Sequence, residues 1–331
     1  MPKRILLASI ATVSALALAA CGTTEAPAGS ADPAQTGAAG EAVTVVDARG
    51  ESVEIPAGVE DVVAVEWVAV EHLQTVGIAP VGVADASGYE EWAGTGAPLE
   101  GEPQDVGTRT EPSIDAIAGL APDLIVAVAG RDAGAYGDLE AIAPVLVLQG
   151  ADASKGLDVV FDDLRLVGEA TGREDAAETA IDDLEAHIDE LSDRVEQAGL
   201  TGTPIAQLDG YETGGQIEIR PYAEGALLPS AFEAIGFENA WPEAGDPQYG
   251  LGQTDVEGLT VLPDDAHIVY MTVGDRDVFQ NELAGNAIWT GLPAVQAGNV
   301  HRLPDGIWLF GGVHSVQAYL DALVGTFAPT P

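Results

Sequence analysis

Arginine is scarce in this chain, so the places where it occurs point to chemistry. The sequence of 331 residues holds 54 acidic and 12 basic residues, a formal net charge of −42. Arg109 nevertheless stands on a Gly-Thr turn, in the segment DVGTRTEPSIDAIAGLAPDLIV of residues 105–126. A guanidinium group is planar, always charged and carries a fixed fork of donors, which suits it to hold ligand oxygens. A surface ion pair with an acid such as Glu111 is the other interpretation.

Two further arginines follow apolar runs that are typical of buried strands. Arg131 lies in VAVAGRDAG, and Arg276 takes an equivalent place in YMTVGDRDVF. Loops at the carboxyl ends of parallel strands face the crevice of an open α/β sheet, so both side chains are expected at a cleft. Alternatively, Asp132, Asp275 and Asp277 neutralise these arginines locally.

The histidines and the single cysteine predict neither a metal site nor an active site. The histidines are His72, His187, His267, His301 and His314. They show no His-x-x-x-His or Cys-His spacing, and no Gly-x-Ser-x-Gly elbow, Walker loop or dinucleotide fingerprint is present. Ser315 beside His314 marks a helix start, because adjacent residues do not make a triad. We expect no enzyme, with an unrecognised hydrolase as the remaining alternative.

Short β-branched runs and amphipathic stretches alternate along the first half of the chain. The predicted buried strands are Val62–Val65, Val81–Ala84, Leu124–Val128 and Val145–Leu148. The predicted helices are Ala69–Val76, Ser113–Leu120 and Tyr136–Ile142. Ser113 is placed as the N-cap of its helix. Such alternation predicts an α/β lobe with a mostly parallel sheet.

From about residue 154 to residue 198 the pattern is helical only, with an interruption at Gly172. A coiled coil is the alternative there, but the apolar repeat lasts only about two heptads, which favours a packed helix. Alternation then resumes. The later predicted elements are Ile205–Leu208, Gln216–Arg220, Ala226–Ile235, Ile268–Val273 and Ser315–Val324. We therefore predict a lobe at 43–153, a connecting helix at 154–171 and a second lobe at 172–331.

The first residues have the form of an export signal. MPKRILLASIATVSALALAACG combines two positive charges, a short apolar run and small residues before Cys21. Leu-Ala-Ala-Cys resembles the bacterial lipoprotein box, in which the cysteine is lipidated. We predict a signal peptide at 1–20 and a flexible polar tether at 21–42, with an ordinary signal or an uncleaved anchor as alternatives.

Four segments, in this order, resemble one protein family. They are VVAVEWVAVEHLQTVGIAPVGVADASGYEEW (62–92), DVGTRTEPSIDAIAGLAPDLIV (105–126), LEAIAPVLVL (139–148) and GIWLFGGVHSVQAYLDAL (306–323). They are similar to the iron-siderophore substrate-binding proteins of ABC importers, and most of all to the ferric-hydroxamate binders. The resemblance implies two α/β lobes with central, mostly parallel sheets. It also implies one long rigid helix that joins them, a ligand cleft between them and only a small closure.

The same resemblance implies roles for the arginines. Arg109 would reach into the cleft and donate to the oxygens that chelate iron. Arg131 and Arg276 align with arginines that hold catecholate siderophores, whereas hydroxamate binders often carry an aromatic at the first position. Arg220, in QIEIRPY, is a further candidate for ligand binding.

Aromatic side chains form the other part of the implied cleft. The candidates are Trp308 in GIWLFGG, Tyr249 in DPQYGLG, Trp67 and Trp92. Flat side chains provide a large apolar contact with modest loss of entropy. Core packing is favoured for Trp289 and stays open for Trp67 and Trp241.

Two carboxylates are candidates for docking to a permease. In the family each lobe presents an acid to permease arginines, and the matching residues are Asp115 in EPSIDAI and Glu257 in TDVEGL. Glutamate is usual at the first position. Plain surface acid is the alternative in so acidic a chain.

Together these inferences predict an extracytoplasmic, lipid-anchored monomer that binds a ferric siderophore and delivers it to an ABC permease. Iron would arrive chelated, so we expect no cofactor and no metal ligand of the protein's own. Hydroxamates are favoured, with ferric citrate, ferric catecholates, haem and cobalamin as alternatives. A sensory or adhesive lipoprotein is the alternative of another class. Nucleic acid is excluded as a partner, because phosphate binding needs a basic face.

Overall fold

The computed structural model describes residues 41–131 and 133–328. The chain divides into two compact units, residues 1–38 and 39–331, and all of the described residues belong to the second. The predicted signal peptide, Cys21 and the tether up to residue 40 lie outside the described residues. No helix within the described ranges combines the length and apolarity that a membrane span requires.

The first lobe is built on a parallel sheet of five strands, in the order β5-β4-β3-β6-β7. Its strands are β3 (Val62–Ala64), β4 (Gly82–Val83), β5 (Gln104–Asp105), β6 (Leu124–Val128) and β7 (Val145–Leu148). Its helices are α1 (Trp67–Thr75), α2 (Ala86–Trp92), α3 (Ile114–Leu120) and α4 (Tyr136–Glu140). Side chains of β6 alternate between two hydrophobic clusters: Val126 joins one, and Ile125 and Ala127 join the other. Burial on both faces explains why β6 and β7 appear in the sequence as unbroken apolar runs.

The predicted cap of α3 is confirmed. The Ser113 side chain accepts a hydrogen bond of 3.3 Å from the backbone N–H of Ala116. The helix ends at Ala121, which has the left-handed φ of 48°. An antiparallel hairpin of β1 (Val43–Val46) and β2 (Ser52–Ile55) precedes the sheet and was not predicted.

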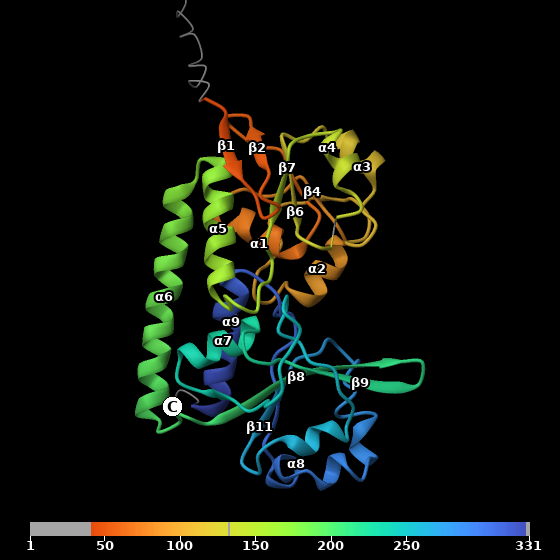
Figure 1. Ribbon diagram of the computed structural model, residues 1–331, viewed down its shortest axis with the longest axis vertical. Coiled ribbons are helices and arrows are strands. Elements are labelled where there is room, and N and C mark those ends of the chain that lie inside the picture. The colour runs from red at the N-terminus through yellow and green to blue at the C-terminus, as the bar shows by residue number, and fades with distance from the viewer. Residues whose placement is uncertain (1–40, 132, 329–331) are drawn as a thin grey trace, which may run out of the picture. The chain divides into compact units, whose positions relative to one another are not determined.

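Two consecutive helices follow the first sheet, and one of them connects the lobes. The segment predicted as the connector, 154–171, forms α5 (Asp158–Thr171), which contacts β1, β7 and α1 of the first lobe. Gly172, with φ of 67°, ends it. The long helix that reaches both lobes is α6 (Glu174–Gln197), which lies along α5 and against α9 (Val313–Phe327) of the second lobe (Figure 1). The connecting role therefore belongs to α6, because α5 packs on the first lobe.

The second lobe holds another sheet of five strands, in which β8 carries an additional antiparallel partner, β9. Its strands are β8 (Pro204–Thr213), β9 (Gln216–Pro221), β10 (Glu238–Asn239), β11 (His267–Tyr270) and β12 (Val300–Arg302). The α-helices are α7 (Leu227–Ala234), α8 (Pro293–Ala297) and α9, and the 3-10 helices are η1 (Gly258–Val261), η2 (Leu283–Gly285) and η3 (Trp289–Gly291). The other four strands pair in parallel, so the sheet is mostly parallel as predicted.

The hydrophobic core is continuous across the two lobes. One cluster joins a face of the first sheet to α5, α6, α7 and α9. The backbone N–H groups of Thr95 and Gly96, in the first lobe, both donate to the carbonyl of Gly306 in the second, at 2.9 Å. Trp289 and Trp241 are buried in a separate cluster of the second lobe, so both are core residues. The lobes therefore share a packed interface in addition to the helical connection.

Candidate functional site

Glu66 and Arg109 form the central ion pair of the cleft between the lobes. Glu66 follows β3 and caps α1, accepting from the backbone N–H of Trp67 at 2.9 Å. Arg109 Nε and Nη2 lie 2.7 and 2.6 Å from Glu66 Oε1, and Arg131 Nε lies 2.9 Å from the same oxygen. The partner of Arg109 is thus Glu66, not Glu111. Both arginines and the acid stand where parallel strands end, which brings them to one edge of the sheet.

Arg109 also stacks on two of the predicted tryptophans. Its guanidinium carbon lies 4.1 Å from the ring centroid of Trp67 and 4.9 Å from that of Trp308. The Trp67 indole is 3% exposed and donates to the Ala84 carbonyl at 3.1 Å. Trp67 is therefore both a core residue and a wall of the cleft, and the two interpretations of it are compatible.

A second ion pair lies on the β8–β9 hairpin. The antiparallel register sets Asp209 opposite Arg220, and Arg220 Nε donates to Asp209 Oδ1 at 2.8 Å. Burial lowers the pKa of Arg220, but its hydrogen bonds and charge interaction with Asp209 outweigh this and raise the pKa above its usual value. Phe310 lies beside this pair, 5.9 Å from the guanidinium carbon of Arg220 and 5.5 Å from the ring of Tyr249.

A third ion pair links the two lobes at the edge of the cleft. Arg276, after β11, pairs with Glu91 on α2. The guanidinium carbon of Arg276 lies 5.1 Å from the ring of Trp92. Asp277 does not neutralise Arg276: its carboxylate is buried and lies 3.5 Å from Arg302 Nη1. The partner of Arg276 thus comes from the opposite lobe.

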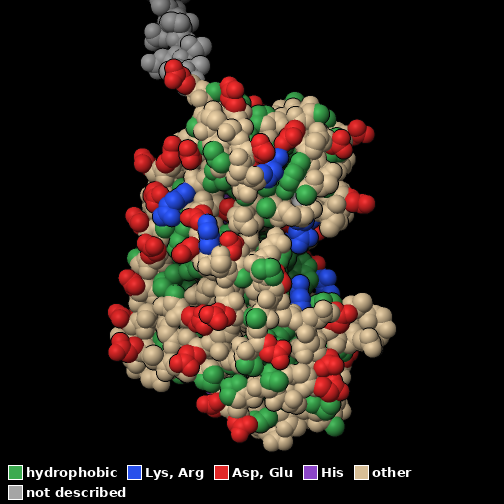
Figure 2. All heavy atoms as spheres, in the orientation of Figure 1, with side chains coloured by type: hydrophobic (Ala, Val, Ile, Leu, Met, Phe, Trp, Pro, Cys, Tyr) green, Lys and Arg blue, Asp and Glu red, His purple; other side chains and the backbone are tan. Residues whose placement is uncertain are grey.

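Apart from the Glu91–Arg276 pair, which lies beside Trp92, the residues of these ion pairs and aromatic contacts line two adjoining hollows. One of about 110 Å³ is lined by Glu66, Arg131 and Tyr249, and one of about 270 Å³ by Trp67, Trp92 and Trp308. Both are also lined by Arg109, Arg220 and Phe310, so they are parts of one cleft. Ligand pockets usually measure about 300–1,000 Å³, so a drug-sized ligand would occupy both hollows. Figure 2 shows basic and apolar side chains at the notch between the upper and lower parts of the molecule, whereas acid is spread over the rest of this face.

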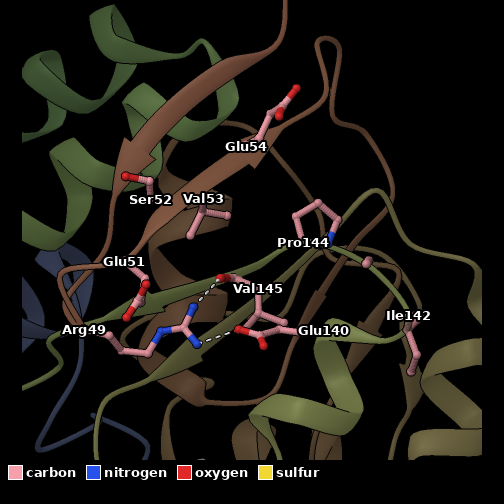
Figure 3. Close-up of a pocket in the computed structure, with 10 residues that line it drawn as sticks. Arg49, Glu51, Ser52, Val53, Glu54, Glu140, Ile142, Pro144 and Val145 are labelled. Atoms are coloured by element: carbon pink, nitrogen blue, oxygen red, sulfur yellow. Dashed lines mark hydrogen bonds and ion pairs between the residues drawn. The ribbon is translucent and has the colours of Figure 1, made fainter.

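A broader hollow, of about 800 Å³, lies beside the β1–β2 hairpin (Figure 3). Its one lining arginine, Arg49, donates to Glu140 at 2.7 Å and to the Val145 carbonyl at 3.2 Å. The remaining lining residues are Glu51, Ser52, Val53, Glu54, Ile142, Ala143 and Pro144. Because Glu51 and Glu54 add acid and no second cation lines this hollow, we favour the smaller cleft as the functional site.

Three of the predicted arginines and all four predicted aromatic residues line the cleft, and the fourth arginine, Arg276, lies beside it. The sequence reasoning missed Glu66, Asp209, Glu91 and Phe310. Glu66 was detectable, since it directly follows a buried strand, as Arg131 does. Phe310 was also detectable, because it lies two residues beyond Trp308 in the same motif. Ion pairs between distant segments have no such local signal.

The docking candidates Asp115 and Glu257 are both exposed, one in the first turn of α3 and the other just before η1.

Among the described residues, no group of three or more His, Cys, Asp or Glu side chains is placed to hold a metal ion. His267 and His301 contact each other at 3.0 Å, and His187 contacts Asp321 at 2.9 Å.

Comparison with known proteins identifies the family. The model of the periplasmic binding protein family matches residues 62–306. The chain belongs to the periplasmic binding protein family. Its relatives include the probable siderophore-binding lipoprotein YfiY of Bacillus subtilis, 25% identical over the whole of both chains. The iron(3+)-hydroxamate-binding protein FhuD of Escherichia coli is 27% identical over 79% of this chain and 85% of that protein.

A solved structure extends this likeness to three dimensions. The siderophore-binding protein FhuD of Vibrio cholerae, bound to Fe3+-Desferal, superimposes with a TM-score of 0.71 and 26% identity. That match covers 82% of this chain and 99% of the other. Relatives of this chain are named as lipoproteins or periplasmic proteins, which are located outside the cytoplasm.

Proposed function

We propose that this protein captures a ferric siderophore outside the cytoplasm and delivers it to an ABC permease. The observation that carries the proposal is the convergence of Arg109, Arg131 and Arg220 with aromatic rings in one cleft between the lobes. Guanidinium groups donate to the oxygens that chelate Fe(III) without replacing them as metal ligands. The aromatic rings provide apolar contact for the organic part of the chelate. Family membership and the named relatives support the same function.

Hydroxamate siderophores are the favoured ligand class. Each cleft arginine already pairs with a carboxylate of the protein, which favours ligands of low net charge over polyanions. Ferric citrate is the second candidate, because three arginines line the cleft and Arg276 lies at its edge. The iron belongs to the ligand, and the protein contributes binding without chemistry of its own.

Further parts of the proposal concern attachment and delivery. Cys21 would carry the lipid anchor after removal of residues 1–20, and residues 21–42 would form the tether. Asp115 and Glu257, one in each lobe, would dock against basic residues of the permease, and the binder would act as a monomer. Because α5 packs on the first lobe, we assign residues 43–171 to the first lobe, α6 to the connection and residues 204–331 to the second lobe, in place of the bounds expected from the sequence.

The test is a tryptophan-fluorescence titration of the purified protein. Ferrichrome, ferrioxamine, ferric citrate, a ferric catecholate, haemin and cobalamin are added separately, with the iron-free chelators as controls. Saturable quenching by ferric hydroxamates supports the proposal, because Trp67, Trp92 and Trp308 line the cleft. Selective binding of haemin or cobalamin would be consistent with the fold but would reject a siderophore as the ligand. Binding of none would favour a sensory or adhesive role.

A further inference from the structure

Every arginine at the cleft is paired with a carboxylate, two of which line the cleft and one of which lies at its edge. Glu66 pairs with both Arg109 and Arg131, and Asp209 pairs with Arg220. The third acid, Glu91, pairs with Arg276 from the other lobe. Three arginines and two acids therefore line the cleft, with a formal charge of +1, and the neutral Glu91–Arg276 pair lies beside it against Trp92.

We infer that Glu66, Asp209 and Glu91 are specificity-determining residues, which hold the arginines in ion pairs and so exclude polyanionic ferric chelates. This inference rests on the proposed function. A polyanion that entered would have to displace a carboxylate from its arginine or lie beside it, and both are unfavourable. A neutral or cationic chelate meets neither penalty. Its oxygens can accept hydrogen bonds from the arginine N–H groups that are not bonded to the carboxylates.

The three acids differ in how firmly they are held. The Glu66 side chain is 5% exposed and also caps α1, so its substitution would affect the fold as well as the cleft. Asp209 is 9% exposed and additionally accepts from Tyr222 Oη at 3.2 Å. The Glu91 side chain is 49% exposed, and Arg276 is its one polar side-chain partner among the described residues. Glu91 is thus the acid whose loss tests charge selection with the least structural disturbance.

A structural role for this pair would give a different result. If the Glu91–Arg276 pair served only to hold the lobes together, its loss would change the affinity for every ligand in the same direction. Charge selection requires instead that the change depend on the charge of the ligand. A role in charge selection is therefore recognised by a change in the ratio of the affinities for ferric citrate and for a hydroxamate. A purely structural role leaves this ratio constant.

The experiment compares Glu91→Gln with the wild-type protein. Dissociation constants are measured for ferrioxamine B, ferrichrome and ferric citrate, at low salt and at physiological salt. Glu190→Gln removes the same charge from an exposed position on α6, outside the cleft, and is the matched control. We expect Glu91→Gln to bind ferric citrate about tenfold more tightly than the wild type, with the affinity for ferrichrome changed less than about twofold. Glu190→Gln is expected to change neither affinity.

Each other outcome is decisive. Equal changes for all ligands, or no change, would overturn charge selection while leaving siderophore capture intact. Preference of the wild type for ferric citrate over both hydroxamates would also overturn it. Failure of the wild type to bind any ferric chelate would instead reject the proposed function. Asp209→Asn gives a second measurement of the same ratio at the inner ion pair.

Discussion

The side chain of Ser315, at the start of α9, donates a hydrogen bond of 2.6 Å to Glu71 on α1, so the two lobes meet at a buried carboxylate. Glu71 also accepts from the backbone N–H groups of Gly312, at 2.8 Å, and Ser315, at 3.3 Å. The acid lies at the N-terminus of α9, where backbone donors favour a negative charge. Burial outweighs these hydrogen bonds and raises the pKa of Glu71 from 4.5 to about 7.

This raised pKa predicts a pH-dependent contribution to stability. The folded state binds the Glu71 proton more tightly than the unfolded state does, so the contribution is complete below pH 4.5 and is lost as the pH rises to about 7. The loss amounts to about 3 kcal/mol in the free energy of unfolding. Denaturant unfolding of the wild type and of Glu71→Gln across this range checks it. A difference between the two proteins that does not change with pH would contradict the prediction.

His72, next to Glu71, predicts a contribution of the opposite sign. Neither ring nitrogen of this buried histidine has a hydrogen-bond partner among the described residues. Burial, with a smaller effect from the charge of His314, lowers the pKa of His72 from 6.5 to about 3. Its contribution to stability is therefore complete above pH 6.5 and is lost as the pH falls toward 3. We expect His72→Leu to unfold less steeply on acidification than the wild type, and an unchanged acid transition would refute this.

Arg109 should be the arginine whose loss most weakens ligand binding. It borders both hollows, contacts two indole rings and is the most buried of the cleft arginines, with 15% of its side chain exposed. Removing it also leaves Glu66 with one arginine instead of two. We expect Arg109→Ala to bind a ferric hydroxamate about 100-fold more weakly than the wild type does, which is the usual effect of truncating a buried charged residue at the centre of a binding site. Isothermal titration measures this, with Arg165→Ala on the exposed face of α5 as the control.

The docking acids should affect transport without affecting ligand binding. Asp115 and Glu257 are exposed and lie outside both hollows. Charge reversal at either position, as Asp115→Lys or Glu257→Lys, is expected to leave the dissociation constant of the siderophore unchanged and to lower iron uptake by cells at least about tenfold. Normal uptake with both residues reversed would contradict their role.

Sequence patterns located most of the fold because its elements are locally encoded. The runs at Leu124–Val128 and Val145–Leu148 are strands with the predicted bounds, since both faces of the sheet are buried. Ser113 caps its helix as its residue type and position indicated. The hairpin of β8 and β9 turns at Gly214 and Gly215, both with positive φ. This Gly-Gly signal for an antiparallel pair was present in the sequence and was overlooked.

The partners of the arginines required the three-dimensional arrangement. Glu66 and Arg109 lie 43 residues apart, and Glu91 and Arg276 lie 185 residues apart. Chain topology decides which of 54 acidic residues meets a given arginine. Local acids such as Glu111 and Asp277 were therefore reasonable candidates, and the sequence alone offered no means of rejecting them.

The most direct test of the central claim compares one siderophore with and without its iron. The arginines of the cleft are proposed to bind oxygens that Fe(III) has organised, so the ferric complex should bind and the iron-free chelator should not. Isothermal titration of the wild-type protein with ferrichrome and with iron-free ferrichrome measures both. The account predicts an affinity at least about 100-fold higher for the ferric form, because the flexible free chelator must also be ordered on binding. Equal affinity for the two forms, or no binding of either, would contradict it.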